Sequence, residues 1–256
     1  MNVTTRPATM TDTEWKTRCD LAALYRLVAH HRWTDFIYTH ISARLPGSDH
    51  HFLINRYGVN FHEMRASDLI RIDLDGNVME NSGKDSRDVN AAGFTIHSAI
   101  HAARADLMCV IHTHSTAGIA VSAMREGLLP LSQHAMKFYN RLAYHGYEGI
   151  ALDLSERERL VADLGSHKAM ILRNHGLLVV GTSIPEAFHQ LYMLERACAA
   201  QVAALSCGQE LVIPPEAVCQ HASDQFKSFE QDTAHYAILW DAALRLIDGE
   251  AGDYRN

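Results

Sequence analysis

Two stretches of the sequence decide the fold: LMCVIHTH at residues 107–114 and KAMILRNHGLLVVG at residues 168–181. Both are short, apolar and bounded by polar residues, which is typical of strands buried inside a sheet. The second stretch is interrupted by Asn174, His175 and Gly176, so it predicts two strands joined at a sharp break. The fold is therefore expected to centre on a few buried strands, with histidines at the points where these strands end.

Helical and strand patterns alternate on both sides of these stretches. Apolar residues recur at helical spacing over residues 13–29, 90–105 and 117–124. Residues 36–45, 51–57 and 68–80 alternate apolar and polar side chains, as half-buried strands do. Thr11 or Thr13 is expected to cap the first helix, and Ser183 with Pro185 and Glu186 opens a long later helix. One more amphipathic helix is expected over residues 226–246. The patterns predict one α/β domain with antiparallel or mixed strands and flanking helices.

Composition excludes several classes of function. The 256 residues are 47% hydrophobic and 21% charged, and the formal net charge is −7 with dispersed basic residues, so no nucleic acid partner is expected. No apolar run approaches the roughly 20 residues of a membrane helix, and the first residues lack the apolar core of a signal peptide. Five cysteines without a C-x-x-C pair indicate reduced thiols in a cytoplasmic protein. A chain of this length has no need of a metal to fold.

Three histidines form a candidate metal site. His112 and His114 are separated by one residue in a predicted strand, so they project from the same face, roughly 6.6 Å apart. His175 lies in the sharp break before Gly176, where the backbone can direct a side chain into a cleft. Three neutral imidazoles leave coordination positions open, which is the pattern of catalytic sites. Incidental histidines are the alternative interpretation, because separation in sequence does not reveal distance in space.

Longer motifs surround these histidines. They are VIHTH at 110–114 after HSAIHAARAD at 97–106, FLINRYGVNFHEMRASDL at 52–69, AVSAMREGLLPLS at 120–132, LAYHGYEGI at 142–150 and MILRNHGL at 170–177. Together they resemble the class II aldolase/adducin family, and especially its adducin-like branch, over about residues 18–204. The resemblance implies a single three-layer α/β/α domain over residues 1–256, with a mostly antiparallel or mixed central sheet. A helical segment over about residues 222–256 would follow the core.

The resemblance also implies a cofactor and an assembly. His112, His114 and His175 match the residues that bind a divalent metal in the family's enzymes, so we expect zinc, with iron(II) or manganese as alternatives. In those enzymes the ion polarises a carbonyl group of a small-molecule substrate. The enzymes are commonly ring tetramers, which implies a homotetramer here, with each site lying between subunits.

The chain departs from the family's sugar-phosphate aldolases at several positions. Gly93 stands where those enzymes carry a glutamate that acts as the general base. Ser42 and Arg44 of their phosphate-binding segment are kept, but His40 replaces an asparagine, Tyr57-Gly58 replaces a threonine-glycine pair, and Ala91 and Ala92 replace two serines. A phosphate dianion needs several converging donors, so an unphosphorylated substrate is expected, with Arg44 as a structural ion-pair partner. His40, Ser42, Tyr57 and Gly58 are the candidate substrate-binding residues.

The resemblance implies two further catalytic candidates. His134 occupies the position of a tyrosine that donates a proton in some of these aldolases. Tyr254 lies near the C-terminus, where a tyrosine closes over the site of a neighbouring subunit in the family's enzymes. A solvent-facing histidine and an unstructured terminus are the alternative interpretations.

Three functions are consistent with these observations. The first is a metal-dependent, aldolase-like lyase acting on a small, unphosphorylated hydroxy-carbonyl compound. The second is a mononuclear non-haem Fe(II) oxygenase acting on an aromatic α-keto acid, because some family members without the glutamate act in this way. The third is a non-catalytic interaction module like adducin. The three intact histidines favour an enzyme, whereas Gly93 counts against an ordinary aldolase.

Overall fold

The computed structural model describes residues 6–7, 10–47, 50–79, 88–249 and 253–256, and within them seven strands form one mixed sheet. The strand order is β3-β2-β1-β4-β7-β6-β5, and every neighbouring pair is antiparallel except β5 and β6, which are parallel. The strands are β1 (His40–Arg44), β2 (Phe52–Ile54), β3 (Ile70–Ile72), β4 (Cys109–Thr113), β5 (Ala143–His145), β6 (Ala169–Leu172) and β7 (Gly176–Gly181).

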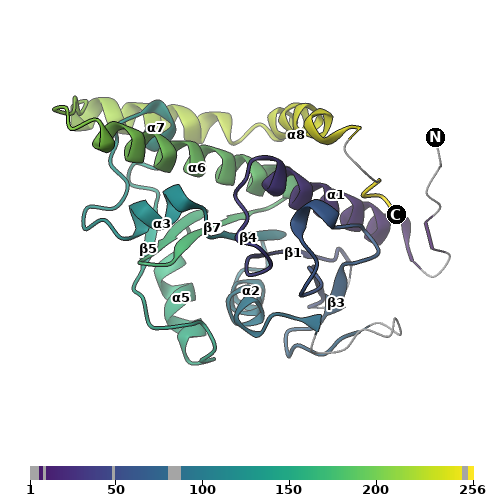
Figure 1. Ribbon diagram of the computed structural model, residues 1–256. Coiled ribbons are helices and arrows are strands. Elements are labelled where there is room, and N and C mark those ends of the chain that lie inside the picture. The colour runs from purple at the N-terminus through teal and green to yellow at the C-terminus, as the bar shows by residue number, and fades with distance from the viewer. Residues whose placement is uncertain (1–5, 8–9, 48–49, 80–87, 250–252) are drawn as a thin grey trace.

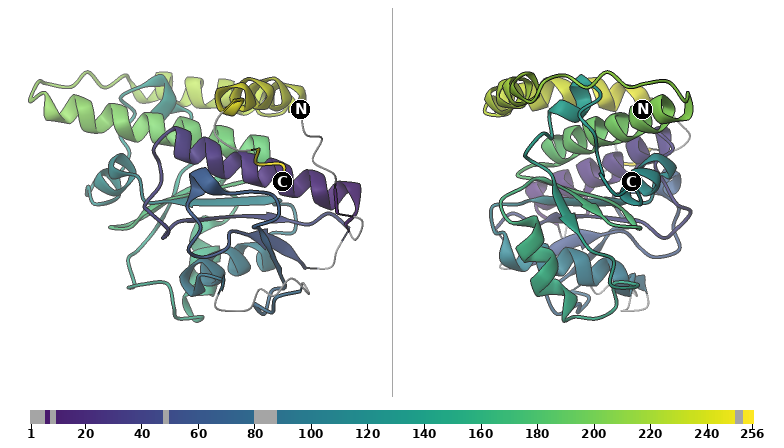
Figure 2. Two further views of the ribbon diagram at one scale, coloured as in Figure 1. Left: turned by 45° about the vertical axis from the view of Figure 1, so that its right-hand side comes forward. Right: turned by 90° about the vertical axis from the view of Figure 1, so that its left-hand side faces the viewer.

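Helices cover both faces of this sheet (Figure 1). The helices are α1 (Asp12–His30), the 3-10 helix η1 (Phe61–Glu63), α2 (Ala91–Ala103), α3 (Thr116–Ser122), α4 (Gln133–Met136), α5 (Glu156–Leu164), α6 (Ile184–Ser206), α7 (Glu216–Phe229) and α8 (Thr233–Ile247). Helices α1 and α6 lie on one face and α2 and α5 on the other, with α8 outside α1 and α6. Figure 2 shows the same layers from two other sides. The predicted three-layer α/β/α domain with a mixed, mostly antiparallel sheet is confirmed.

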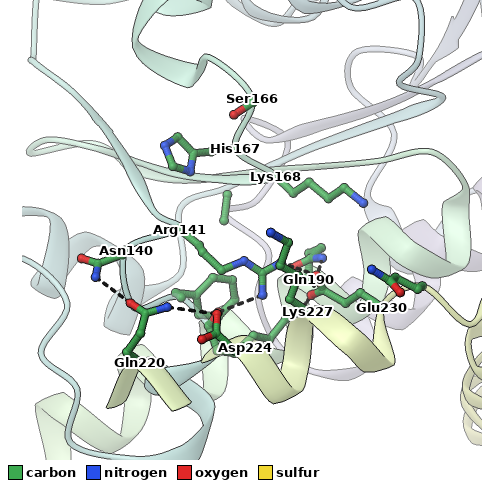
Figure 3. Close-up of a pocket in the computed structure, with 14 residues that line it drawn as sticks. Asn140, Arg141, Ser166, His167, Lys168, Gln190, Gln220, Asp224, Lys227 and Glu230 are labelled. Atoms are coloured by element: carbon green, nitrogen blue, oxygen red, sulfur yellow. Dashed lines mark hydrogen bonds and ion pairs between the residues drawn. The ribbon is translucent and has the colours of Figure 1, made fainter. Parts of the chain in front are cut away.

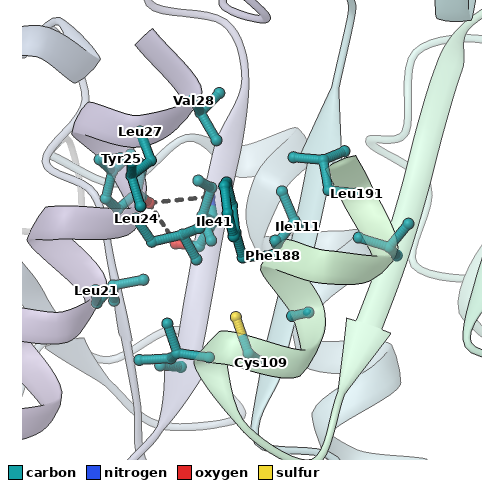
Figure 4. Packing of buried hydrophobic residues seen from close by; sticks show 14 of the residues in the cluster. Leu21, Leu24, Tyr25, Leu27, Val28, Ile41, Cys109, Ile111, Phe188 and Leu191 are labelled. Carbon is teal, nitrogen blue, oxygen red and sulfur yellow. Dashed lines mark hydrogen bonds between the residues drawn. The ribbon is translucent and has the colours of Figure 1, made fainter. Parts of the chain in front are cut away.

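The two faces of the sheet have separate apolar cores. The larger core joins α1 and α6 to the sheet through residues such as Leu24, Ile41, Ile111 and Leu191 (Figure 4). The second core lies between the sheet and the α2–α5 layer and includes Ile100. Because β4 and β7 are central and buried on both faces, β7 is apolar throughout and β4 is apolar up to Ile111, rather than alternating.

Local signals account for where the helices begin. Thr11 caps α1, since its hydroxyl accepts a hydrogen bond from the amide of Glu14 at 3.1 Å. Ser183 caps α6 in the same way, accepting from the amide of Glu186 at 3.2 Å. Both predicted caps are confirmed, and each satisfies an amide that the helix itself leaves without a partner.

The chain departs from the predicted elements mainly towards its C-terminus. The single helix predicted over residues 226–246 was wrong, because α7 ends at Phe229 and α8 begins at Thr233, with Asp232 capping α8. Strand β5 and helices α4 and α5 were not predicted. Glu80, at the end of the predicted strand 68–80, lies outside the described residues. Among the described helices, none combines the length and apolar character that a membrane crossing requires.

Candidate metal centre

The Nε2 atoms of His112, His114 and His175 converge on one point. His112 Nε2 lies 2.8 Å from His114 Nε2 and 3.2 Å from His175 Nε2, and the latter two are 2.9 Å apart. Two nitrogens bound to one tetrahedral ion at roughly 2.0–2.1 Å are separated by roughly 3.3 Å. The observed separations are therefore close to those of three ligands around one metal ion.

Strand pairing places these three side chains together. His112 is paired with Leu178 in the antiparallel ladder of β4 and β7, so the end of β4 lies beside the start of β7. Asn174 has a positive φ of 55°, which turns the chain sharply between β6 and β7. A side chain at Gly176 would place its Cβ 2.3 Å from the carbonyl oxygen of Thr113, so only glycine fits here. The Asn-His-Gly break therefore directs His175 towards β4.

Outer hydrogen bonds leave the converging nitrogens free to bind a metal. His112 Nδ1 lies 2.9 Å from the carbonyl oxygen of Leu177, which can only accept, so the proton is on Nδ1 and Nε2 carries a lone pair. His114 Nδ1 lies 2.9 Å from Asp35 Oδ2, which orients that ring in the same way. Such partners are usual around metal-binding histidines. Asp35 was not predicted from the sequence.

Burial keeps two of the three imidazoles, His112 and His175, neutral. It lowers the pKa of His112 well below its usual value and that of His175 to about 4, and the neighbouring imidazoles lower both further. Imidazoles must be unprotonated to bind a metal, so this environment fits a divalent ion. The donor set, the spacing and the outer hydrogen bonds all agree with a site for one such ion.

Replacing Asp35 by asparagine is expected to weaken metal binding by about 10- to 100-fold without unfolding the chain. The carboxylate fixes the proton of His114 on Nδ1, and an amide would hold that ring less firmly. Competition with a chromogenic chelator would measure the affinity, with Asp241→Asn as the control at an exposed aspartate on α8, outside the site. Equal affinities of the wild type and Asp35→Asn would show that Asp35 does not support the site.

The three histidines open onto a cavity of about 510 Å³. Its wall contains tyrosines and aliphatic side chains from several loops, namely Tyr38, Tyr57, Ile96, Ile119, Tyr147, Ile150 and Leu152. Asp35, His40, Asn90 and Asn174 supply polar groups, and no lysine or arginine belongs to the described lining. The cavity therefore offers a mainly apolar, partly aromatic space beside the metal site.

Only two of the other predicted site residues are among the described residues that line this cavity. His40 and Tyr57 line it, whereas Ser42, Gly58, His134 and Tyr254 are not among its described lining residues. Gly58 is in the turn after β2 with a φ of 91°. His134 is in the first turn of α4.

Tyr254 is held within its own chain. Its side chain is only 5% exposed and joins the larger apolar core. Its carbonyl oxygen accepts a hydrogen bond from the amide of Ala66 at 2.8 Å. The C-terminal residues 253–256 thus pack beside the loop before β3.

Arg44 has a structural role, although its partners are not carboxylates. Its guanidinium donates to the backbone carbonyl oxygens of His101 and Leu107, which joins β1 to the end of α2 and the loop that follows. The predicted structural role thus agrees with these contacts, whereas the expected ion pair is replaced by carbonyl oxygens. A guanidinium used in this way is directed away from the cavity and is not available to bind phosphate.

Glu195 supports β4, the strand that carries His112, from the opposite face. It extends from α6 and accepts hydrogen bonds from Thr113 Oγ1 at 2.8 Å and Ser115 Oγ at 2.6 Å. These two residues flank His114, so the carboxyl group fixes the end of β4. Burial raises the pKa of Glu195 to about 7, although the two hydroxyl groups oppose the shift. A buried glutamate on a helix gave no signal in the sequence.

Replacing Glu195 by glutamine is expected to flatten the pH dependence of stability. A carboxyl with a raised pKa binds its proton more tightly when folded, so the free energy of unfolding rises as pH falls from above 7 towards 4.5. The shift corresponds to at most about 3 kcal/mol, which glutamine would abolish. Urea unfolding of the metal-free protein at pH 5 and pH 8 would measure this. The same pH difference in both proteins would contradict the assignment.

A second cavity, of about 520 Å³, lies between α7 and the loop before β6 (Figure 3). Several of its charged groups are paired: Glu230 with Lys137 and Arg141, and Lys168 with Glu186, which lies outside the lining. Burial, together with the nearby cations, lowers the pKa of Lys137 to about 7. We interpret this cavity as part of an ion-pair network that attaches α7 to the domain, and it contains none of the converging histidines.

Comparison with known proteins identifies relatives that match most of this chain. A Caulobacter vibrioides protein that carries a provisional class 2 aldolase name is 52% identical over 246 residues, covering 96% of this chain and 94% of that protein. Alpha-adducin of Rattus norvegicus is 45% identical over 190 residues, which are 74% of this chain and 26% of adducin. The chain thus corresponds to about a quarter of adducin.

Solved structures show the same fold. An aldolase II superfamily protein from Pseudomonas syringae has 53% identity and a TM-score of 0.89, covering 96% of this chain and 98% of that one. L-fuculose 1-phosphate aldolase from Glaciozyma antarctica has 29% identity and a TM-score of 0.80, covering 98% and 97%. The family model described as Class II Aldolase and Adducin N-terminal domain matches residues 19–202. The chain therefore belongs to the class II aldolase and adducin N-terminal domain family.

Proposed function

We propose that this chain is a divalent-metal-dependent lyase that acts on a small, unphosphorylated hydroxy-carbonyl compound. His112, His114 and His175 would hold the metal, and zinc is the proposed ion. The observation that carries the proposal is the convergence of three Nε2 lone pairs at the wall of a largely apolar cavity. Three histidine ligands leave room for a substrate oxygen.

The cavity lining supports an unphosphorylated substrate. A phosphate dianion is bound in proteins by charged or converging N–H and O–H donors. The described lining lacks lysine and arginine, and Ala91 and Ala92 present methyl groups where the family's sugar-phosphate aldolases have serines. A neutral hydroxy-carbonyl compound suits such a lining better.

The chain's own residues would bind and orient this compound. When bound, a divalent ion would polarise a substrate carbonyl group. His40, Tyr57 and Asn174 line the same cavity and are the proposed polar contacts to the substrate. Ser42 would act indirectly, since its hydroxyl contacts buried histidines behind His40. The aliphatic wall would exclude water from the reacting groups.

The aromatic wall favours a second candidate. Tyr38, Tyr57 and Tyr147 surround the opening of the cavity, and Tyr147 lies 6.4 Å from the ring of His175. Such a wall suits an aromatic α-keto acid, and three histidines with open positions also suit iron(II). A mononuclear non-haem oxygenase is therefore the alternative function. An adducin-like interaction module is the third, supported by 45% identity to alpha-adducin.

We further propose a homotetramer in which the cavity lies near a neighbouring chain. Large apolar side chains next to the cavity are exposed, including Phe36 at 67% and Ile150 at 73%. A second copy would cover such a patch. The proposed roles of His134 as a proton donor and of Tyr254 in closing over a site both require a neighbouring chain, because neither lines the cavity of its own chain. Tyr254 would also have to leave the apolar core in which its side chain is buried. A monomer in light scattering at micromolar concentration would contradict this assembly.

Metal analysis of protein purified without oxygen and without added metal tests the function. Stoichiometric zinc would support the lyase, iron would support the oxygenase, and a metal-free protein would favour the interaction module. Calorimetry on the metal-loaded protein would then compare dihydroxyacetone phosphate with an aromatic α-keto acid and an unphosphorylated hydroxy-ketone. Micromolar affinity for the phosphate compound alone would contradict the proposed substrate class.

A further inference from the structure

Four buried polar side chains form one hydrogen-bonded chain behind the cavity. His40 Nδ1 lies 2.7 Å from His97 Nε2, His97 Nδ1 is bonded to Ser42 Oγ, and Ser42 Oγ lies 2.8 Å from His101 Nε2. Strand β1 supplies His40 and Ser42, and helix α2 supplies the other two. All four are buried, and only His40 lines the cavity. The hydrogen-bonded chain therefore has one end at the cavity and the other in the protein interior.

The hydrogen bonds that link these four side chains can all point in either of two directions. A neutral imidazole carries one N–H, and among the described residues Ser42 Oγ contacts no partner other than His97 and His101, so its hydrogen must go to one of them. Each member then donates to one neighbour and accepts from the other. In one order the protons point inward, and His101 ends the chain with an N–H at Nδ1. In the other they point outward, and His40 ends the chain with an N–H at Nε2.

The buried end decides between these orders. His101 Nδ1 is buried without a hydrogen-bond partner among the described residues, and its ring lies 4.7 Å from that of Phe52. An orphaned N–H is rarer in protein interiors than an acceptor without a donor. The guanidinium of Arg44 is bonded to the carbonyl oxygen of His101 and adds a positive charge nearby. This charge also favours a lone pair, rather than an N–H, at His101 Nδ1. The outward order is therefore favoured, and it leaves the proton of His40 on Nε2.

We propose that this hydrogen-bonded chain of four side chains makes His40 a fixed hydrogen-bond donor, through Nε2–H, for a negatively charged oxygen of a ligand at the metal centre. The inference rests on the proposed metal-dependent function. His40 is paired with His112 across β1 and β4, and the two rings are 5.0 Å apart. A pre-oriented donor beside a site where negative charge develops stabilises that charge. The ligand class is thus an alkoxide, enolate or hydroxamate-type anion, and His40 acts as a donor and not as a base.

The position of the proton on His40 can be measured without metal or substrate. Long-range proton–nitrogen correlation spectra of protein labelled with 15N-histidine distinguish the two neutral forms, and His40→Gln assigns the His40 signals by their loss. We expect His40 to carry its proton on Nε2. Protonation on Nδ1, or averaging between the two nitrogens, would overturn the proposal.

A designed reversal provides a second measurement. Ser42→Asp places an acceptor without a proton between His97 and His101, so both rings must donate to it. At a pH where the same spectra show His97 to be neutral, His40 must then donate to His97 through Nδ1. We expect the proton of His40 to move from Nε2 to Nδ1. Ser223→Ala, which removes another buried hydroxyl on α7, is the control and should leave the signals of His40 unchanged. A folded Ser42→Asp protein in which His40 keeps its proton on Nε2 would show that the hydrogen-bonded chain does not determine which nitrogen of His40 carries the proton.

Ligand affinity tests the role of this proton. Calorimetry would measure the binding of acetohydroxamate, an anionic chelator, to zinc-loaded protein. His40→Phe fills the space without a donor and is expected to bind about tenfold more weakly, whereas His40→Gln, whose amide can donate, keeps most of the affinity. Equal binding by His40→Phe and the wild type, at equal zinc content, would overturn the donor role. Failure of the wild type to bind zinc would instead refute the proposed function and leave the proton measurement valid.

Discussion

Replacing His112 by alanine is expected to lower the affinity for a divalent metal by more than about a hundredfold, since loss of an outer partner alone costs about 10- to 100-fold. His114→Ala and His175→Ala should behave in the same way, because the three Nε2 atoms meet at one point. Metal retained after dialysis, measured by mass spectrometry, would give the occupancy. His221→Ala, an exposed histidine on α7, is the matched control.

Circular dichroism would separate loss of metal from loss of fold in these variants. A domain of this size buries enough apolar surface to fold without an ion, so the spectra should resemble the wild type. Full occupancy in any one of the three variants would exclude that residue as a ligand. Unfolding of all three would show that the metal has a structural role.

Replacing Gly93 by glutamate is expected to destabilise the protein by about 1–3 kcal/mol, as overpacking of a filled site does. A Cβ at this position would lie 2.7 Å from Cδ2 and 2.8 Å from Cγ of His40. The imidazole is buried and bonded to His97, so it cannot move aside cheaply. The variant should also not cleave ketose 1-phosphates, although it regains the carboxylate of the family's aldolases, because the described cavity lining has no lysine or arginine to bind the phosphate. Urea unfolding and an aldol-cleavage assay would measure both effects.

The double variant His40→Ala/Gly93→Glu tests the reason for this effect. Without the imidazole, the glutamate has room, so the double variant should be more stable than the sum of the single changes predicts. A coupling free energy above about 0.5 kcal/mol is expected for residues in contact. Gly146→Ala is the control, because a Cβ there meets no atom within 4 Å. Wild-type stability of Gly93→Glu would contradict the overlap with His40.

The sequence predicted the parts of the site that depend on local pattern. The i, i+2 spacing of His112 and His114 predicted that both side chains lie on one face. The structure brings their Nε2 atoms together, although β4 ends at Thr113 and His114 directly follows the strand. The approach of His175 needed the resemblance to known proteins, because it depends on the pairing of β4 with β7. Asp35 could not be predicted, since it is 79 residues from His114 and no periodicity links them.

The same limit explains the missed elements of the fold. Strand β5 has three residues and lies at the parallel edge of the sheet, so it is too short for an alternating pattern to be visible. The break between α7 and α8 falls at Gln231 and Asp232, where apolar spacing continues on both sides and a single helix was predicted. The contact between Gly93 and His40 joins α2 to β1 and has no counterpart in either local sequence.

The β4–β7 ladder has a consequence for how the chain would acquire the proposed metal. His112 and His114 are close together even in an unfolded chain, but His175 is 63 residues from His112. Closing so long a loop costs entropy, and pairing between distant strands is slow. During refolding, the His-x-His pair would capture an ion early and weakly, and resistance to a chelator would arise only once β7 had joined β4. The rate at which metal becomes chelator-resistant would therefore follow completion of the central sheet.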